Sequence, residues 1–232
     1  MRKILEADRI SFRDQLKPSS FEITSGFTTL MGPSGSGKTT CARLLIGAIG
    51  LSTGEIRHLN NDTAEGFTIT PERQSLGTHF RLESNQNRSV KKYIARYCGY
   101  VAQTPELPTD MTVREYIHNV RVAMGNRLDA QYVEQLLERL GIAENVNKLA
   151  SEQSGGEQQR TAIAFALANK PNLLVADEPN ASLDSVTGEA VLQLARSLAN
   201  QGTSILWITH TKEHQDYADN RLYANDGEVY GL

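Results

Sequence analysis

Hydrophobic residues in the second half of the chain fall into short runs separated by helical patterns. The runs at 173–176 and 204–209 are mainly apolar, which is typical of strands buried on both faces of a sheet. An alanine-rich stretch at 158–168 and an aligned apolar pattern at 186–199 predict helices before and after the first run. This alternation predicts a mostly parallel sheet covered on both faces, with functional groups at the carboxyl ends of its strands.

The first residues of the chain predict a sheet-forming start. Strands are expected at 4–7, 21–23 and 27–31, from alternating or continuous apolar residues. The last of these strands leads into a glycine-rich loop, and an apolar helix follows at 42–46. The order along the chain is therefore strand, loop, helix.

A polar, turn-rich stretch at about 58–89 follows that helix. Period-two alternation at 66–70 and 78–83 favours a long antiparallel excursion that faces solvent, and disorder is the competing interpretation. Apolar residues at helical spacing over 90–97 predict a short amphipathic helix. We interpret the basic residues beside it as a solvated face, in preference to a contact with RNA or lipid head groups.

Two amphipathic helices are predicted in the middle of the chain. Thr112 and Glu115 form a capping-box pattern where the first begins. Its apolar face comprises Val113, Tyr116, Ile117, Val120 and Met124. The second helix should end at Gly141, and its apolar face comprises Val133, Leu136, Leu137 and Leu140.

These patterns divide one domain, residues 1–232, into parts. We expect a small helical subdomain at 112–150, inserted into a core formed by 1–111 and 151–232. An edge hairpin around Asp226-Gly227 should close the chain.

Composition excludes several classes of function. The net charge is −3 and the sequence pI is about 6.0, so no overall positive field favours direct binding of nucleic acid. The two cysteines, Cys41 and Cys98, lack metal-site spacing and are interpreted as packing residues of a protein in a reducing compartment. Acidic residues near the N-terminus argue against a signal peptide, and no stretch approaches the ~20 apolar residues that span a bilayer. Any work on a membrane would therefore need a partner.

The glycine-rich loop matches the phosphate-loop pattern G-x-x-x-x-G-K-[ST]. Glycines let backbone N–H groups converge on one anion, and the following helix directs its positive end at that anion. Lys38 would reach the outer phosphates and the Thr39 hydroxyl would ligate Mg²⁺. A plain Gly/Ser turn before a helix is the alternative. The candidate nucleotide-binding residues of the loop are Gly32, Pro33, Ser34, Gly35, Ser36, Gly37, Lys38, Thr39 and Thr40.

Ionisable residues follow both buried strands of the second half. Asp177 and Glu178 come directly after the first run, where Asp177 could hold Mg²⁺ and Glu178 could polarise an attacking water. His210 directly follows the second run and could orient the γ-phosphate and that water. Loop caps and a structural histidine are the alternative interpretations.

A second glycine-rich helix start, Ser154–Arg160, completes a recognisable order of motifs. With the phosphate loop, the Asp177–Glu178 pair, Ser182-Leu183-Asp184 and His210, it resembles the ATP-binding cassette (ABC) ATPases over essentially the whole chain. Ser154–Arg160 resembles the family signature and is the most specific of these motifs. The strand before Asp177 resembles Walker B, Gln103 the Q-loop glutamine, Asp184 part of the D-loop and His210 the switch histidine.

The resemblance implies an α/β fold of the P-loop NTPase type, with a mostly parallel core sheet, an antiparallel β subdomain and a small helical subdomain. It also implies that two copies stack head to tail around ATP and Mg²⁺. ATP held by Lys38 and Thr39 of one copy would then meet the signature of the other. The signature residues expected to bind nucleotide are Ser154, Gly155, Gly156 and Glu157.

The resemblance also assigns roles at the reacting centre. Glu178 would be the general base, His210 the contact to the γ-phosphate, and Lys38 a further catalytic group. Mg²⁺ would be held by Thr39, Asp177 and Gln103, and Gln103 would link it to the helical subdomain. Asp184 and, as the nearest aromatic to the usual adenine-stacking position, Phe12 complete the nucleotide-binding set; an interior strand phenylalanine is the alternative for Phe12.

The chain departs from the family pattern in two further places. Gln153 stands where the family usually has leucine, which puts the packing of the signature turn in question. The polar insertion at 58–89 is longer than usual and is interpreted as a specific docking surface.

These features predict the ATP-hydrolysing subunit of an ABC transporter. It would act as a homodimer or an ABC heterodimer on separate transmembrane permease subunits, located in the cytoplasm on the inner face of the membrane. The alternative is a soluble or non-transport ABC ATPase acting on nucleic acid or a membrane protein. A small-molecule kinase would leave Ser154–Arg160 unexplained. Substrate and direction of transport stay open.

Overall fold

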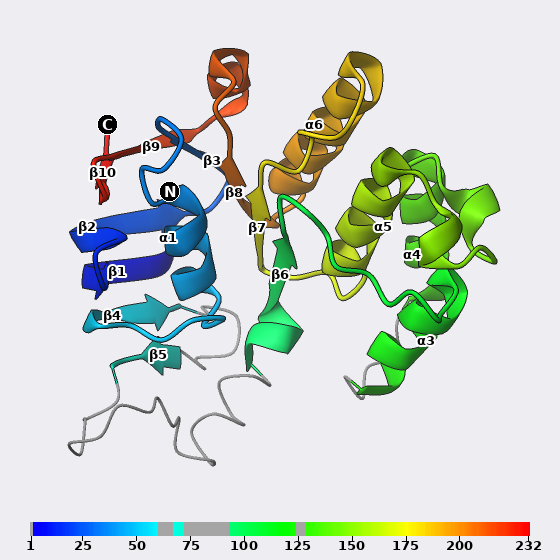
Figure 1. The fold of residues 1–232 in the computed structure, drawn as a ribbon, viewed down its shortest axis with the longest axis horizontal. Coiled ribbons are helices and arrows are strands. Elements are labelled where there is room, and N and C mark those ends of the chain that lie inside the picture. The colour runs from blue at the N-terminus through cyan, green and yellow to red at the C-terminus, as the bar shows by residue number, and fades with distance from the viewer. Residues whose placement is uncertain (1, 60–66, 72–92, 124–128) are drawn as a thin grey trace.

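A six-stranded sheet forms the centre of the computed structural model, which describes residues 2–59, 67–71, 93–123 and 129–232 (Figure 1). Its order is β10-β9-β3-β8-β7-β6, and every neighbouring pair is parallel except β10 with β9. The predicted mostly parallel sheet is thus confirmed. The strands are β3 (Phe27–Met31), β6 (Cys98–Val101), β7 (Leu173–Asp177), β8 (Ser204–Ile208), β9 (Asn220–Asn225) and β10 (Glu228–Gly231).

Both faces of this sheet are buried, as the continuous apolar runs predict. Along β7, Leu173 and Val175 face one hydrophobic cluster while Leu174 and Ala176 face the other. The first cluster includes the inner face of α1 (Lys38–Leu45), and the second includes α5 (Gly155–Leu167) and α6 (Ser185–Asn200). Figure 1 accordingly shows α1 on one side of β7 and β8, and α5 and α6 on the other.

An antiparallel sheet of order β2-β1-β4-β5 covers the side of α1. Its strands are β1 (Lys3–Phe12), β2 (Leu16–Thr24), β4 (Thr53–His58) and β5 (Phe67–Ile69). β1 and β2 extend well beyond the predicted strands at 4–7 and 21–23. The alternation fails along β1 because Arg9, at φ 46°, sits in an irregular stretch of the ladder, and buried positions shift from Ala7 to Ile10.

The polar insertion at 58–89 falls largely outside the described residues. Its predicted alternation at 66–70 corresponds to β5, which pairs with β4, while 78–83 is not described. Residues 93–97 are helical, and the rings of Tyr93 and Phe67 stack with centroids 5.6 Å apart. Tyr93, on the predicted apolar face, therefore packs on β5, while residues 90–92 of the predicted helix lie outside the described residues.

The middle of the chain forms α3 (Val113–Ala123) and α4 (Ala130–Arg139), followed by short 3₁₀ turns at Ala143–Asn145 and Ala150–Glu152. The predicted capping box is present: the Thr112 N–H donates to Glu115 Oε2 and the Glu115 N–H donates to Thr112 Oγ1. Gly141 adopts φ 64° just beyond α4. The predicted face of α4 is buried, and it comprises Val133, Leu136, Leu137 and Leu140. On the predicted face of α3, Met124 and the side chain of Val120 are not described.

The predicted edge hairpin is β9 and β10. Asp226 and Gly227 in its turn have φ of 48° and 78°, the left-handed pair that a tight hairpin turn requires. The Val229 N–H donates to Ser19 Oγ on β2, which joins the hairpin to the antiparallel sheet. A last 3₁₀ helix, η3 (Lys212–Tyr217), precedes β9. Among the described residues, none of the helices combines the length and the apolar composition of a membrane-spanning segment.

Both cysteines are packing residues, as expected. Cys41 is fully buried in the core and Cys98 is half-buried at its edge. Burial raises the pKa of each thiol to about 12, so neither forms a thiolate at neutral pH.

His58 is a buried histidine at the end of β4, behind the phosphate-loop helix. Its Nε2 lies 2.8 Å from the Leu45 carbonyl, to which it donates, and its Nδ1 lies 3.9 Å from Cys98 Sγ. Burial lowers the pKa of His58 to about 4, because a charged imidazole would lose its hydration there.

We expect this histidine to make the fold sensitive to acid. Between about pH 6.5 and 4, His58 binds a proton in the unfolded chain, where its pKa is near 6.5, but stays neutral in the folded chain. The free energy of unfolding therefore falls as the pH drops from about 6.5 towards 4. Between pH 7 and pH 4.5 the wild type should lose about 2 kcal/mol more free energy of unfolding than His58→Gln, whose amide can still donate to Leu45. Urea unfolding of both proteins at the two pH values measures this, and equal losses would contradict it.

Candidate functional site

The predicted phosphate loop connects the end of β3 to α1, and two of its glycines are required by close packing. At Gly32, φ is 152° and an added Cβ would lie 2.0 Å from the Ala224 carbonyl oxygen. At Gly37, φ is 94° and a Cβ would lie 2.8 Å from the Gln15 carbonyl oxygen. Side chains at either position would push the loop away from its neighbours. Pro33, Ser34 and Gly35 are exposed, so the tip of the loop is accessible to a ligand.

Lys38 lies along the inside of this loop. Its side chain is buried, and its Nζ donates to the carbonyl oxygens of Gly32 at 2.9 Å and Pro33 at 2.8 Å. Burial lowers the pKa of Lys38, while the charges of Glu178 and Asp177 act in the opposite direction. The ammonium is therefore held beside the predicted anion site.

Asp177 and Thr39 form a pair suited to Mg²⁺. Asp177 is the last residue of β7, one position further into the strand than predicted, and its carboxyl is buried with Oδ2 lacking a hydrogen-bond partner. Burial raises its pKa, and a hydrogen bond from the Thr39 side chain opposes that rise. A carboxylate oxygen without a partner beside a hydroxyl fits Mg²⁺, which takes one or two protein ligands and fills its shell with water and phosphate oxygens.

The described residues offer no denser metal site. Among them, no group of three or more His, Cys, Asp or Glu side chains could hold a metal ion.

Glu178 is the point where three predicted residues meet. The Gln103 side-chain amide donates to Glu178 Oε2 at 3.0 Å, and His210 Nδ1 lies 3.4 Å from Glu178 Oε1. Glu178 itself has a left-handed backbone, with φ 45°. The carboxylate thus stands at the carboxyl end of β7 with a polar partner on each oxygen, next to the buried Asp177.

The signature segment begins a helix earlier than predicted. α5 starts at Gly155, three residues before the predicted start at Gln158, because Ser154 caps it. The Glu157 N–H donates to Ser154 Oγ and the Ser154 N–H donates to Glu157 Oε2, which is a complete capping box. This box favours helix strongly enough to include two glycines in the first turn.

Glu157 is fully engaged within its own chain. Besides the bond from Ser154, its Oε1 accepts from Asn145 Nδ2 at 2.7 Å and lies 3.6 Å from Lys148 Nζ. The hydrogen bonds of Ser154 lower the pKa of Glu157 to about 2, with Asn145 adding to the effect. Ser154 and Gly155, at the start of this helix, are exposed to solvent. Figure 1 places α5 across β6 and β7 from α1, so the structure does not bring the signature to the phosphate loop of the same chain.

Gln153 is accommodated by a polar partner. The side chain is buried, and the Thr161 hydroxyl on α5 donates to its Oε1 at 3.0 Å. Its Nε2 is buried without a partner. At the position where the family usually has leucine, the turn before the signature therefore packs around a Gln153–Thr161 hydrogen bond.

Two other predicted nucleotide contacts have structural roles here. Asp184 caps α6, and bonds from the side chain and the N–H of Thr187 lower its pKa. Phe12 is half-buried at the end of β1 with Arg13 over its ring, 5.1 Å from the centroid. The turn that follows β1 borders the phosphate loop, because the Thr40 hydroxyl donates to Gln15 Oε1 at 3.1 Å. Nucleotide binding by Asp184 and Phe12 stays a prediction.

Several residues near the site carry no signal that we used in the sequence. Gln15 meets the phosphate loop only because β1 and β2 fold over α1. Ser36, by contrast, belongs to the predicted phosphate loop, and its buried hydroxyl has no partner there. His214, Asn180 and Thr209 form hydrogen bonds behind Glu178 and His210. The spacing of four between His210 and His214 was the available clue to these contacts.

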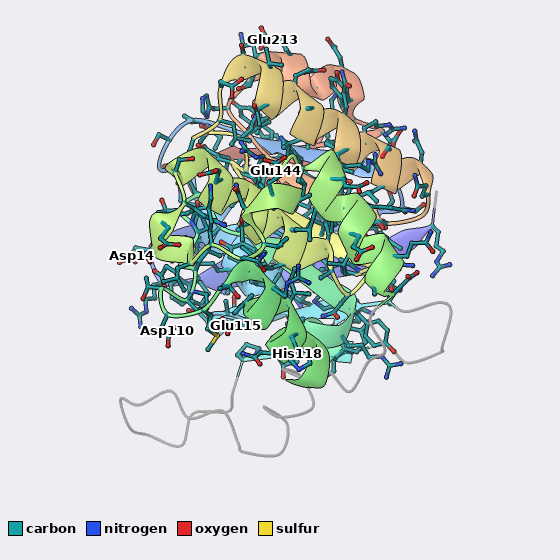
Figure 2. All side chains as sticks on the ribbon, turned by 90° about the vertical axis from the view of Figure 1, so that its right-hand side faces the viewer. Asp14, Asp110, Glu115, His118, Glu144 and Glu213 are labelled. Carbon is teal, nitrogen blue, oxygen red and sulfur yellow. The ribbon has the colours of Figure 1, made fainter. Side chains whose placement is uncertain are left out.

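A separate hollow of about 520 Å³ lies along the start of α3. Figure 2 shows Asp110, Glu115 and His118 at this end of the molecule, and Arg114 also lines the hollow. None of the predicted nucleotide-binding residues lines it.

Comparison with known proteins gives this geometry a family. The sequence model described as ABC transporter matches residues 16–181. The chain is 34% identical over 208 residues to the lipoprotein-releasing system ATP-binding protein LolD 1 of Chlorobium luteolum, covering 87% of this chain and 81% of that protein. It is 34% identical over 215 residues to the cell division ATP-binding protein FtsE of Mycobacterium tuberculosis, covering 91% and 85% of the two chains.

Solved structures agree with the sequence relatives. A dimeric structure of MJ0796, a bacterial ABC transporter cassette, matches with a TM-score of 0.78 and 27% identity, covering 97% of this chain and 96% of the other. A dimer of MJ0796 in a post-hydrolysis state with ADP and Pi matches with a TM-score of 0.77 and 26% identity, covering 99% and 98%. With the phosphate loop, Asp177, Glu178 and His210 arranged around one edge of its sheet, the chain belongs to the ABC transporter family.

Proposed function

We propose that this chain is the ATP-hydrolysing subunit of an ABC transporter, in which ATP-driven dimerisation moves separate permease subunits. The observation that carries the proposal is the convergence of Gln103 and His210 on Glu178, beside the buried Asp177. A carboxylate with fixed partners at the carboxyl end of a strand next to a phosphate loop is the arrangement that nucleotide hydrolysis requires.

Binding of ATP begins with an exchange of partners at Lys38. Its ammonium leaves the carbonyls of Gly32 and Pro33 for the outer phosphates, whose negatively charged oxygens accept stronger hydrogen bonds than neutral carbonyls do. Asp177, Thr39 and Gln103 would hold Mg²⁺. When bound, the ion neutralises charge on the phosphate oxygens during transfer.

Hydrolysis is assigned to Glu178. Its carboxylate accepts a proton from the attacking water, while Gln103 donates to one of its oxygens and His210 lies beside the other. The His210 side chain is 69% exposed, so its ring is accessible to the γ-phosphate. A hydrogen-bond donor such as His210 acts where negative charge builds up on the transferred phosphoryl group.

The second half of the site comes from another copy. Ser154 and Gly155 are exposed at the N-terminus of α5, on the far side of β6 and β7 from α1. A helix N-terminus attracts phosphate, so in a head-to-tail dimer it would stabilise the closed state only while the γ-phosphate is present. We propose a homodimer or a heterodimer with a related cassette; the dimeric relatives support this arrangement.

The permease is proposed to contact the helical subdomain at 112–150. Several contacts support treating this segment as a unit within one domain of residues 1–232. Thr112 pairs with Leu149, the Arg114 N–H donates to the Val146 carbonyl, and the Ser151 hydroxyl donates to the Thr109 carbonyl. Together they close the segment at its base. Through the permease, the chain would lie on the inner face of the cytoplasmic membrane.

Glu178→Gln tests the assignment of the base. The variant should bind ATP as the wild type does, since Lys38 and the phosphate loop are unchanged, and its turnover should fall by about 10²-fold or more because an amide cannot take the proton. In the presence of ATP, the variant should then accumulate as a dimer. Gel filtration with and without ATP detects this dimer. Hydrolysis at the wild-type rate would show that another group is the base.

Ser154→Arg tests the role of the signature in trans. The bulky cation at the start of α5 should prevent dimer closure in the Glu178→Gln background, while the monomer still binds ATP. Ser154→Ala is the matched control, because it removes the helix cap, at a cost of about 1 kcal/mol, without adding bulk. ATP affinity by fluorescence titration and dimer content by light scattering separate the steps. Loss of ATP binding by the monomeric Arg variant would contradict a role in trans.

A further inference from the structure

The His210 side chain has few contacts that hold it in place. Its side chain is 69% exposed, and the polar partner that orients its ring is Glu178, 3.4 Å away. An exposed contact of this kind contributes little on its own. The direction of the ring therefore depends on the backbone at Thr209 and Thr211.

Glu178 depends on its neighbours in a different way. Its φ of 45° is a left-handed conformation that non-glycine residues adopt only where surrounding contacts maintain it. The Glu178 N–H donates to the Ile208 carbonyl on β8, and its own carbonyl accepts from the Ala181 N–H. The segment just after Glu178 must therefore stay in place for the carboxylate to keep its direction.

One buried side chain, His214 of η3, joins these two segments. Its Nδ1 lies 2.8 Å from Thr209 Oγ1, directly before His210, and its Nε2 lies 3.3 Å from Asn180 Nδ2, two residues after Glu178. Thr209 Oγ1 also accepts from the Thr211 N–H at 3.0 Å. The His214 ring is 8% exposed and packs edge-on to Trp207. A single imidazole thus ties the residues that flank His210 to those that follow Glu178.

The partners of His214 assign its protonation. Asn180 Nδ2 is a donor, so Nε2 must accept, and the proton of the neutral ring lies on Nδ1 and is donated to Thr209. Burial lowers the pKa of His214 and favours this neutral form, against the charges of Glu189 and Glu213.

We propose that His214 is a positioning residue for ATP hydrolysis. Through its bonds to Asn180 and Thr209, it holds the loop that follows Glu178 and the loop that contains His210 in a fixed relative position. The inference rests on the proposed function, in which those two residues act on the attacking water and the γ-phosphate. Displacement of reacting groups by about 1 Å can cost up to 10²-fold in rate, so a tie between the two loops acts directly on turnover. Lys38 and the phosphate loop are not part of this network, so binding of ATP does not depend on it.

His214→Leu tests the proposal. The variant fills the space of the ring but loses both hydrogen bonds, and kcat for ATP hydrolysis should fall about tenfold with KM unchanged. His214→Gln should recover most of kcat, because its amide has one acceptor and one donor group that can replace the bonds to Asn180 and Thr209 and keep the two loops joined. His58→Gln is the matched control: it alters a buried histidine outside both loops and should leave kcat at the wild-type value. Steady-state ATPase assays give kcat and KM, and circular dichroism checks that each variant is folded.

Each outcome decides between this inference and the function on which it rests. A wild type without ATPase activity would overturn both. An active wild type with a folded His214→Leu variant of equal kcat, or with a raised KM and unchanged kcat, would overturn the role of His214 alone. If His214→Leu does not fold, Asn180→Ala removes the same bond from the other side, and wild-type kcat in that variant would overturn the inference.

Discussion

The register of three parallel strands is the constraint on which the site depends. Leu30 of β3 and Asp177 of β7 both pair with Ile208 of β8, so the three strands end level with one another. The chain leaves all three strands at this edge of the sheet. The phosphate loop, Glu178 and His210 therefore lie side by side. A slip of one residue between β7 and β8 would turn Asp177 to the opposite face of the sheet and part it from Thr39. The apolar clusters on both faces make that slip costly, since every strand residue would exchange clusters.

The parts of the fold that the sequence predicts are those set by local chemistry. Buried parallel strands read as continuous apolar runs, and the caps at Thr112 and the turn at Asp226 depend only on nearby residues. The start of α5 was also encoded locally, in the Ser154–Glu157 capping box, but two glycines in the first turn concealed it. In β1, the irregularity at Arg9 breaks the alternation, so the pattern alone could not give the full length of the strand.

The site divides in the same way. The phosphate loop, Asp177, Glu178 and His210 were predictable because each lies at a strand end in a recognisable motif. The contacts that hold them were not, because Gln15, Thr161 and His214 meet their partners only after distant segments pack together. Gln153 illustrates the difference: the sequence showed a polar residue at an apolar position, and only the structure supplied Thr161 as its partner. Motifs therefore indicate the candidate reacting groups, while tertiary packing determines which side chains hold them in place.

The internal bonds of Lys38 make nucleotide binding a competition. An incoming anion must displace the carbonyl oxygens of Gly32 and Pro33 from an ammonium that they already satisfy. A weakly charged ion such as chloride gains too little from that displacement, whereas a chain of phosphates offers several negative oxygens at once. If Lys38 binds the outer phosphates as proposed, these two internal bonds would favour a polyphosphate over a small anion with a single charge, because only the polyphosphate offers several negative oxygens in exchange for them.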